Sequence, residues 1–68
     1  MKLSARNQLK GRVTEINEGA VEAVVKIDVS GQQITSVITI EAVRELGLAV
    51  GSEAVAIIKA DHVMIGVE

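Results

Sequence analysis

Apolar and polar side chains alternate with a period of two between residues 20 and 30. One side of this stretch carries only apolar residues, which are Val21, Ala23, Val25, Ile27 and Val29. The other side is mainly charged or polar. Such alternation is typical of a β-strand with one buried face, so the fold is expected to be built on a sheet.

Turn signals on both sides of this strand predict antiparallel neighbours. Residues 8–16 fit a first strand, and the Asn-Glu-Gly sequence at 17–19 can supply the positive φ of a hairpin turn. Ser30 and Gly31 mark a second tight turn into residues 33–40, which are β-branched at nearly every position. Both faces of this third strand carry apolar groups. One face is expected in the interior of a barrel and the other against another subunit.

The second half of the sequence predicts a short helix and two further strands. Residues 41–47 begin with an acidic residue and end at Gly47, which fits one or two helical turns. Their expected apolar stripe consists of Ala42, Val43 and Leu46. Residues 53–59 and 63–67 are apolar runs of strand length. The resulting order, β-β-β-α-β-β, is that of the five-stranded OB-fold, a small Greek-key barrel, although the pattern alone also permits an SH3-like barrel or an open sheet.

The composition favours one small domain, residues 1–68, that associates with other copies. The chain has 68 residues, of which 49% are hydrophobic, and it contains no aromatic residue and no cysteine. Ordering about 70 residues costs on the order of 100 kcal/mol of conformational entropy, and a core this small leaves little surplus. Disulfides are excluded, and a single histidine without thiols gives no structural zinc site. Self-association remains as the source of additional stability.

Charge and hydropathy limit the possible partners. A net charge of −2 argues against a general polyanion binder, because nucleic-acid affinity depends on many Lys and Arg contacts to phosphates. The start of the chain lacks the apolar region of a signal peptide, and no run approaches the ~20 apolar residues that cross a bilayer. A cytoplasmic protein without a membrane partner is expected. The chain's own Met1 favours a free-standing protein over a module of a larger one.

Polar donors are concentrated just before the first strand, at Ser4, Arg6, Asn7 and Gln8. A hydroxyl, a guanidinium and amides placed this close together suit a ligand that is negatively charged and rich in oxygen. Arg6 offers five N–H donors and a constant charge, which match a tetrahedral dianion, although a solvated surface arginine also fits the pattern. Asn7 and Gln8 are expected to fix the strand start and a subunit contact.

This segment, with Leu9 and Gly11 after it, resembles the signature of the molbindins, small intracellular molybdate-binding proteins. The resemblance continues in order through essentially the whole chain: the Ser-Gly turn at 30–31, the strand at 34–39, the helix end at 45–48, the Ala-Ile-Ile-Lys-Ala run at 56–60 and the Val-Met-Ile at 63–65. The same unit, called the TOBE domain, occurs in molybdate-responsive regulators and in ATPases of oxyanion transporters. The resemblance therefore implies the class of ligand first, and it says less about the cellular role. It also implies an OB-like barrel and a homohexamer, a trimer of dimers, with sites completed across subunit contacts.

Carried over by position, the resemblance implies that molybdate is bound by Ser4, Arg6 and Lys59, with a main-chain amide from Ala60. Lys59 ends an apolar run, so the pattern alone also fits a lysine that snorkels to water. Thr39 matches a threonine that relatives use at the start of the helix, where free N–H groups favour an anion. Relatives often carry a serine at the helix start, where this chain has Ala42. Only the backbone N–H of Ala42 could then serve as a donor, and a water could replace the missing hydroxyl.

Other functions fit the sequence less well. His62 beside Asp61 has no suitable nucleophile and reads as a solvated turn, so no enzyme, no organic cofactor and no cation ligands are expected. An OB-type nucleic-acid binder would need aromatic stacking platforms and a basic groove. An assembly or regulatory module without its own ligand is a third possibility. The expected function is intracellular binding, storage and buffering of molybdate, or of the related tungstate.

Overall fold

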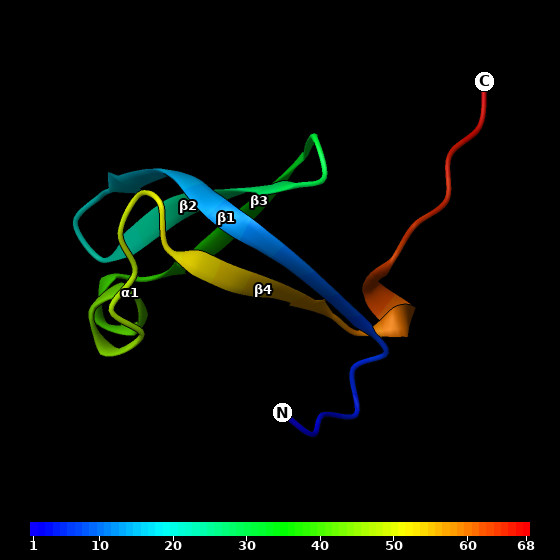
Figure 1. Cartoon of the computed structure of the whole chain (residues 1–68), viewed down its shortest axis with the longest axis horizontal. Helices are drawn as coiled ribbons and strands as arrows, with labels where there is room; N and C mark the ends of the chain where they lie inside the picture. Colours follow the sequence, from blue (N-terminus) through cyan, green and yellow to red (C-terminus); the bar gives the residue numbers. More distant parts are fainter.

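The computed structural model describes all 68 residues, and its main feature is one antiparallel sheet (Figure 1). The elements are β1 (Asn7–Glu18), β2 (Glu22–Val29), β3 (Gln32–Thr39), α1 (Ile40–Glu45), β4 (Glu53–Ile58) and the 3₁₀ helix η1 (Ala60–His62). The four strands lie in the order β3-β2-β1-β4. The predicted all-β class, with one short helix between the third and fourth strands, is confirmed. No helix has the length and apolar character needed to cross a membrane.

The first strand, β1, changes partners halfway along its length. Its N-terminal half pairs with β4, beginning with Asn7 opposite Ile58. Its C-terminal half pairs with β2 and ends with Glu18 opposite Ala23. This long strand therefore connects the outer edge formed by β4 to the β2–β3 hairpin, and the sheet curls around it (Figure 1).

Gly11 lies where β1 passes from one partner to the other. A Cβ atom at this position would lie 2.4 Å from the carbonyl oxygen of Asp28 and 2.6 Å from Cγ2 of Ile27. Only a residue without a side chain lets the two strands approach so closely. Further along β1, the pairing with β2 shifts register between Val13 and Glu15. Such irregularities increase the local bend of a strand.

Tight turns at the predicted places fix the hairpins. Ser30 and Gly31 have φ of 50° and 89°, the two positive angles of a two-residue turn between β2 and β3. At the β1–β2 turn the Gly19 amide donates to the carbonyl oxygen of Glu22 at 2.8 Å. The predicted order of the first three strands is therefore confirmed.

The helix α1 is held by a cap at each end. Thr39 is its N-cap, and the Thr39 hydroxyl accepts a hydrogen bond from the Ala42 amide at 3.0 Å. Gly47, with φ of 62°, follows the C-cap Leu46 and lets the chain leave the helix. Only Val43 of α1 is buried, and Leu46 is 68% exposed, so the predicted apolar stripe is wrong at Leu46. The helix is too short for its final turn to return to the core.

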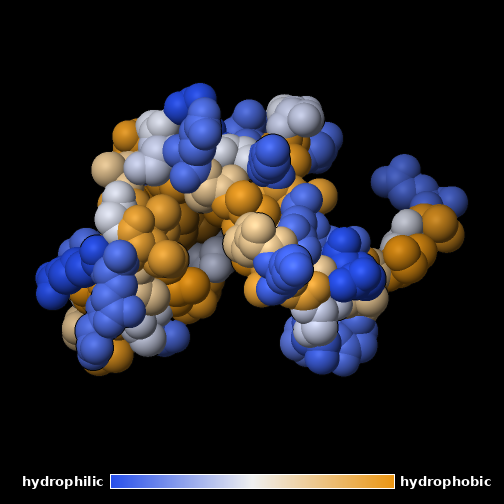
Figure 2. All heavy atoms as spheres, turned by 60° about the horizontal axis from the view of Figure 1, so that its bottom comes forward, coloured by the Kyte–Doolittle hydropathy of each residue, from blue (hydrophilic) through white to orange (hydrophobic).

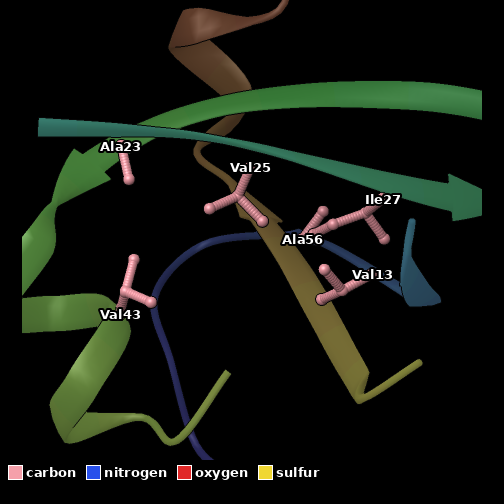
Figure 3. Packing of buried hydrophobic residues seen from close by; sticks show 6 residues of the cluster. All are labelled: Val13, Ala23, Val25, Ile27, Val43 and Ala56. Carbon is pink, nitrogen blue, oxygen red and sulfur yellow. The ribbon is translucent and has the colours of Figure 1, made fainter. Parts of the chain in front are cut away.

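The hydrophobic core is small and lies between the inner face of the sheet and α1 (Figure 3). Its members come from β1, β2, α1 and β4: Val13, Ala23, Val25, Ile27, Val43 and Ala56. The three from β2 follow the predicted alternation. With Ala5, only 7 of the 68 residues are buried, whereas many large hydrophobic side chains remain exposed. A single chain therefore leaves much of its apolar surface in contact with solvent.

The predicted fifth strand is absent from the single chain, and the barrel is not closed. Residues 63–68 are exposed and have no ladder partner, and they extend away from the sheet beyond η1 (Figure 1). The strands β3 and β4 are therefore the two free edges of an open sheet. An apolar run predicts a strand, but it does not specify which edge the strand pairs with.

Candidate anion-binding site

The antiparallel pairing of β1 with β4 brings together four of the six predicted site residues. Asn7 and Ile58 form the last cross-strand pair at this end, and the Asn7 side-chain amide donates to the Ile58 carbonyl oxygen at 3.1 Å. Arg6 immediately precedes β1, and Lys59 immediately follows β4. Ser4 and Ala60 follow within two positions. We call these four residues the β1–β4 cluster.

The N-terminal part of the cluster is ordered by its own hydrogen bonds. Arg6 donates through Nε to the Ser4 carbonyl oxygen at 3.0 Å and through a terminal nitrogen to the Leu3 carbonyl oxygen at 2.9 Å. Gln8 donates to the Ala5 carbonyl oxygen at 3.2 Å. The prediction that Asn7 and Gln8 fix the strand start agrees with these bonds. Both Ser4 and Arg6 remain exposed, so a ligand can reach them.

Ala5 anchors this segment, a role that was not predicted from the sequence. It is 6% exposed, although both of its neighbours are exposed. A small apolar residue between two polar ones is the only signal for it in the sequence. Its burial holds Ser4 and Arg6 at the surface on either side of an anchored position.

Lys59 supplies the second positive charge of the cluster. Its side chain is exposed and makes no ion pair or hydrogen bond within the chain. Its carbonyl oxygen accepts the His62 amide at 3.0 Å, which fixes the first turn of η1. Arg6 and Lys59 thus stand at the same end of two paired strands without an acidic partner. Asp61 and His62 are exposed in η1, as expected for a solvated turn.

The other two predicted residues, Thr39 and Ala42, lie at the opposite end of β1. Thr39 pairs with Glu22, beside the turn that follows β1, whereas Arg6 precedes the first residue of β1. The full length of β1, 12 residues, therefore separates these two residues from the cluster along the sheet. One chain therefore does not bring all six predicted ligands together.

The hydrogen bond between Thr39 and Ala42 reduces the number of free donors that these two residues can present to an anion. The Ala42 amide already donates to the Thr39 hydroxyl oxygen, so it is not the free donor that the sequence analysis predicted. The hydroxyl of Thr39 is exposed and keeps its own proton to donate. No group of three or more His, Asp or Glu side chains comes together in a way that could hold a metal cation.

Comparison with known proteins places this arrangement in a family. Residues 3–65 match the TOBE domain. A relative described as a probable molybdenum-pterin-binding protein, from Haemophilus influenzae, is 56% identical over 69 residues and is covered completely, as is this chain. The chain therefore belongs to the molbindin, or Mop, family of TOBE-domain proteins.

Solved structures agree with this assignment. A molybdate-binding protein from Sporomusa ovata superimposes with a TM-score of 0.92 at 37% identity, covering 96% of this chain and 97% of the other. The cytoplasmic molybdate-binding protein ModG, solved with molybdate bound, has a TM-score of 0.84 at 52% identity. That match covers 88% of this chain and 43% of ModG.

Proposed function

We propose that this protein binds molybdate, or the related tungstate, at sites that form when identical copies assemble. The observation that supports the proposal is the β1–β4 cluster, in which Arg6 and Lys59 flank the outermost pair of β1 and β4 and neither forms an ion pair with an acidic side chain. Ser4 and the Ala60 amide add donors at the same end. The names of the relatives point to the same oxyanion.

Binding of such an anion requires no covalent chemistry. Arg6 presents a planar set of N–H donors, and Lys59 presents a compact ammonium with three donors. Together they neutralise a dianion, and charge-assisted hydrogen bonds replace its hydration shell. Discrimination against sulfate would follow from the size of the closed cavity, because both ions are tetrahedral dianions.

Assembly explains how Thr39 and Ala42 would join the site. They lie at the far end of β1 from the cluster, so the helix start of a second copy would have to supply them. We expect a homohexamer arranged as a trimer of dimers, as the family resemblance implies. The large exposed hydrophobic side chains of the single chain support association. The role we propose is storage and buffering of the anion in the cytoplasm, without catalysis.

The decisive experiment combines calorimetry with native mass measurement. We expect heat and thermal stabilisation with molybdate at micromolar concentration, and much weaker signals with sulfate and phosphate. The mass of the native assembly, with and without molybdate, would give the number of subunits and of bound ions together. A protein that stays monomeric and shows neither heat nor stabilisation with molybdate would refute the proposal.

A further inference from the structure

Two exposed carboxylates flank Thr39, the residue that a second copy would supply to the molybdate site. Glu22 is the cross-strand partner of Thr39 in the β2–β3 pair. Side chains of directly opposed residues project from the same face of a sheet, with Cβ atoms about 5 Å apart. Glu41 lies two residues after Thr39, in the first turn of α1. Wherever Thr39 is placed, these two residues, which we call the Thr39 acids, are placed with it.

The Thr39 acids have no charged partner within the single chain. Both are exposed, and neither takes part in an ion pair of the chain. The Arg6 and Lys59 cations of the β1–β4 cluster also lack an acidic partner. Figure 2 shows hydrophilic side chains gathered over α1 and, apart from them, over the N-terminal end of the chain, with a hydrophobic hollow between the two groups. One chain therefore carries two unpaired carboxylates at one end of β1 and two unpaired cations at the other.

We propose that in the anion-free assembly the Thr39 acids of one copy are the counter-ions of Arg6 and Lys59 of another, and that molybdate binds by displacing them. This step rests on the proposed function, in which the helix start of a second copy completes the cluster. An approach that lets the Thr39 hydroxyl contact the anion also brings both carboxylates within the roughly 8 to 10 Å over which charges interact in salt solution.

The charges in the site balance in both states. Two carboxylates carry the same charge as one molybdate dianion, so Arg6 and Lys59 are neutralised whether the site is empty or filled. Exposed ion pairs are weak, so a dianion that accepts charge-assisted hydrogen bonds can displace them. The Thr39 acids therefore stabilise the empty assembly and compete with molybdate for the same two cations. This competition sets the concentration at which the site fills.

The test compares two double variants that remove the same charge from the same two elements, β2 and α1. Glu22→Gln with Glu41→Gln neutralises the Thr39 acids. Asp28→Asn with Glu45→Gln is the matched control, because both residues are exposed and lie near the far ends of β2 and α1. Calorimetry at one salt concentration gives the molybdate affinity, and light scattering shows that each variant keeps the wild-type mass.

The first readout is the affinity for molybdate. We expect the Glu22→Gln/Glu41→Gln protein to bind molybdate about tenfold more tightly than the wild type, because the competing carboxylates are gone. The control should gain less than about threefold, through the change in net charge alone. A Glu22→Gln/Glu41→Gln protein that binds no more tightly than the control would overturn the proposal.

The second readout separates displaced counter-ions from local structural effects. Without anion, the thermal midpoint of the Glu22→Gln/Glu41→Gln protein should lie below that of the control, because the ion pairs of the empty site are lost. At saturating molybdate most of this difference should disappear, because the acids are displaced in the wild type as well. A difference that persists unchanged at saturating molybdate would contradict the proposal, and so would the absence of any difference without anion.

Single variants keep the comparison possible if a double variant fails to assemble. Glu22→Gln and Glu41→Gln are then compared one by one with Asp28→Asn and Glu45→Gln, under the same two criteria. The proposed function and the displacement of the acids fail separately. Wild-type protein that gives no molybdate heat refutes the proposed function. If the wild type binds molybdate and neutralising the Thr39 acids does not tighten binding beyond the control, molybdate binding stands and displacement is wrong.

Discussion

The side-chain amide of Asn7 donates to the carbonyl oxygen of Ile58, its cross-strand partner, at 3.1 Å. This bond closes the paired end of β1 and β4. Arg6 immediately precedes β1, and Lys59 immediately follows β4. The register of β1 and β4 therefore sets the main-chain positions of both residues at the same end of the strand pair.

Arg6→Ala and Lys59→Ala should each weaken molybdate binding roughly tenfold or more, because each removes a charge-assisted hydrogen bond. Calorimetry measures the affinity, and light scattering shows whether the assembly persists. Lys10→Ala, which also removes one exposed positive charge from this end of the chain, is the control and should bind normally. Loss of the assembly with unchanged affinity would instead assign Arg6 and Lys59 a structural role.

Thr39 caps α1, and in the proposed site its hydroxyl would also contact molybdate. Thr39→Ala should lower the free energy of unfolding by about 1 kcal/mol through loss of the N-cap, and it should also weaken molybdate binding. Thr39→Ser keeps the hydroxyl and should largely preserve both. Urea unfolding and calorimetry measure the two effects. If Thr39→Ala loses stability but binds molybdate as tightly as before, its hydroxyl acts only as a cap.

Ala42→Ser tests whether the helix start belongs to the site. Ala42 is half-buried, and its amide is occupied by the Thr39 hydroxyl, so a serine would add a donor without breaking the cap. We expect molybdate affinity to rise several-fold, consistent with about 1 kcal/mol for an added hydrogen bond, while stability changes little. An unchanged affinity in calorimetry would remove this position from the site.

Gly11→Ala should destabilise the fold by about 2 kcal/mol or more, because the added Cβ would overlap the Asp28 carbonyl oxygen and the Ile27 side chain. Chemical denaturation followed by circular dichroism measures the effect. Lys10→Ala, at the exposed neighbouring position, should change stability little. A fully stable Gly11→Ala protein would show that β1 and β2 do not need this close approach.

Local signals in the sequence were sufficient to predict most of the fold. The Ser30-Gly31 turn supplies the positive φ angles of the hairpin, and the alternation in β2 places Ala23, Val25 and Ile27 in the core. These features depend on neighbouring residues only. Leu46 was misplaced because an apolar stripe does not reveal how many residues of so short a helix face the core.

The fifth strand and the complete site could not be obtained from one chain, for a common physical reason. A strand needs an edge, and the six predicted ligands need a common location, but periodicity and spacing describe only what lies on the same chain. The neighbouring positions of Arg6 and Lys59 could be inferred from one chain, because the register of β1 and β4 sets both at the same end of the strand pair. That a second copy brings its Thr39 to the cluster remains a prediction.

The two hydrogen bonds from Arg6 to the carbonyl oxygens of Leu3 and Ser4 also bear on how the anion is released. In the free protein these main-chain oxygens occupy part of the donor set that an oxyanion would use. An incoming ion that accepts hydrogen bonds from Arg6 must displace these carbonyl oxygens. When the ion leaves, the carbonyl oxygens of Leu3 and Ser4 can accept from Arg6 again. Such competition lowers the net affinity and eases exchange, which suits a reservoir that must give up its contents when the surrounding concentration falls.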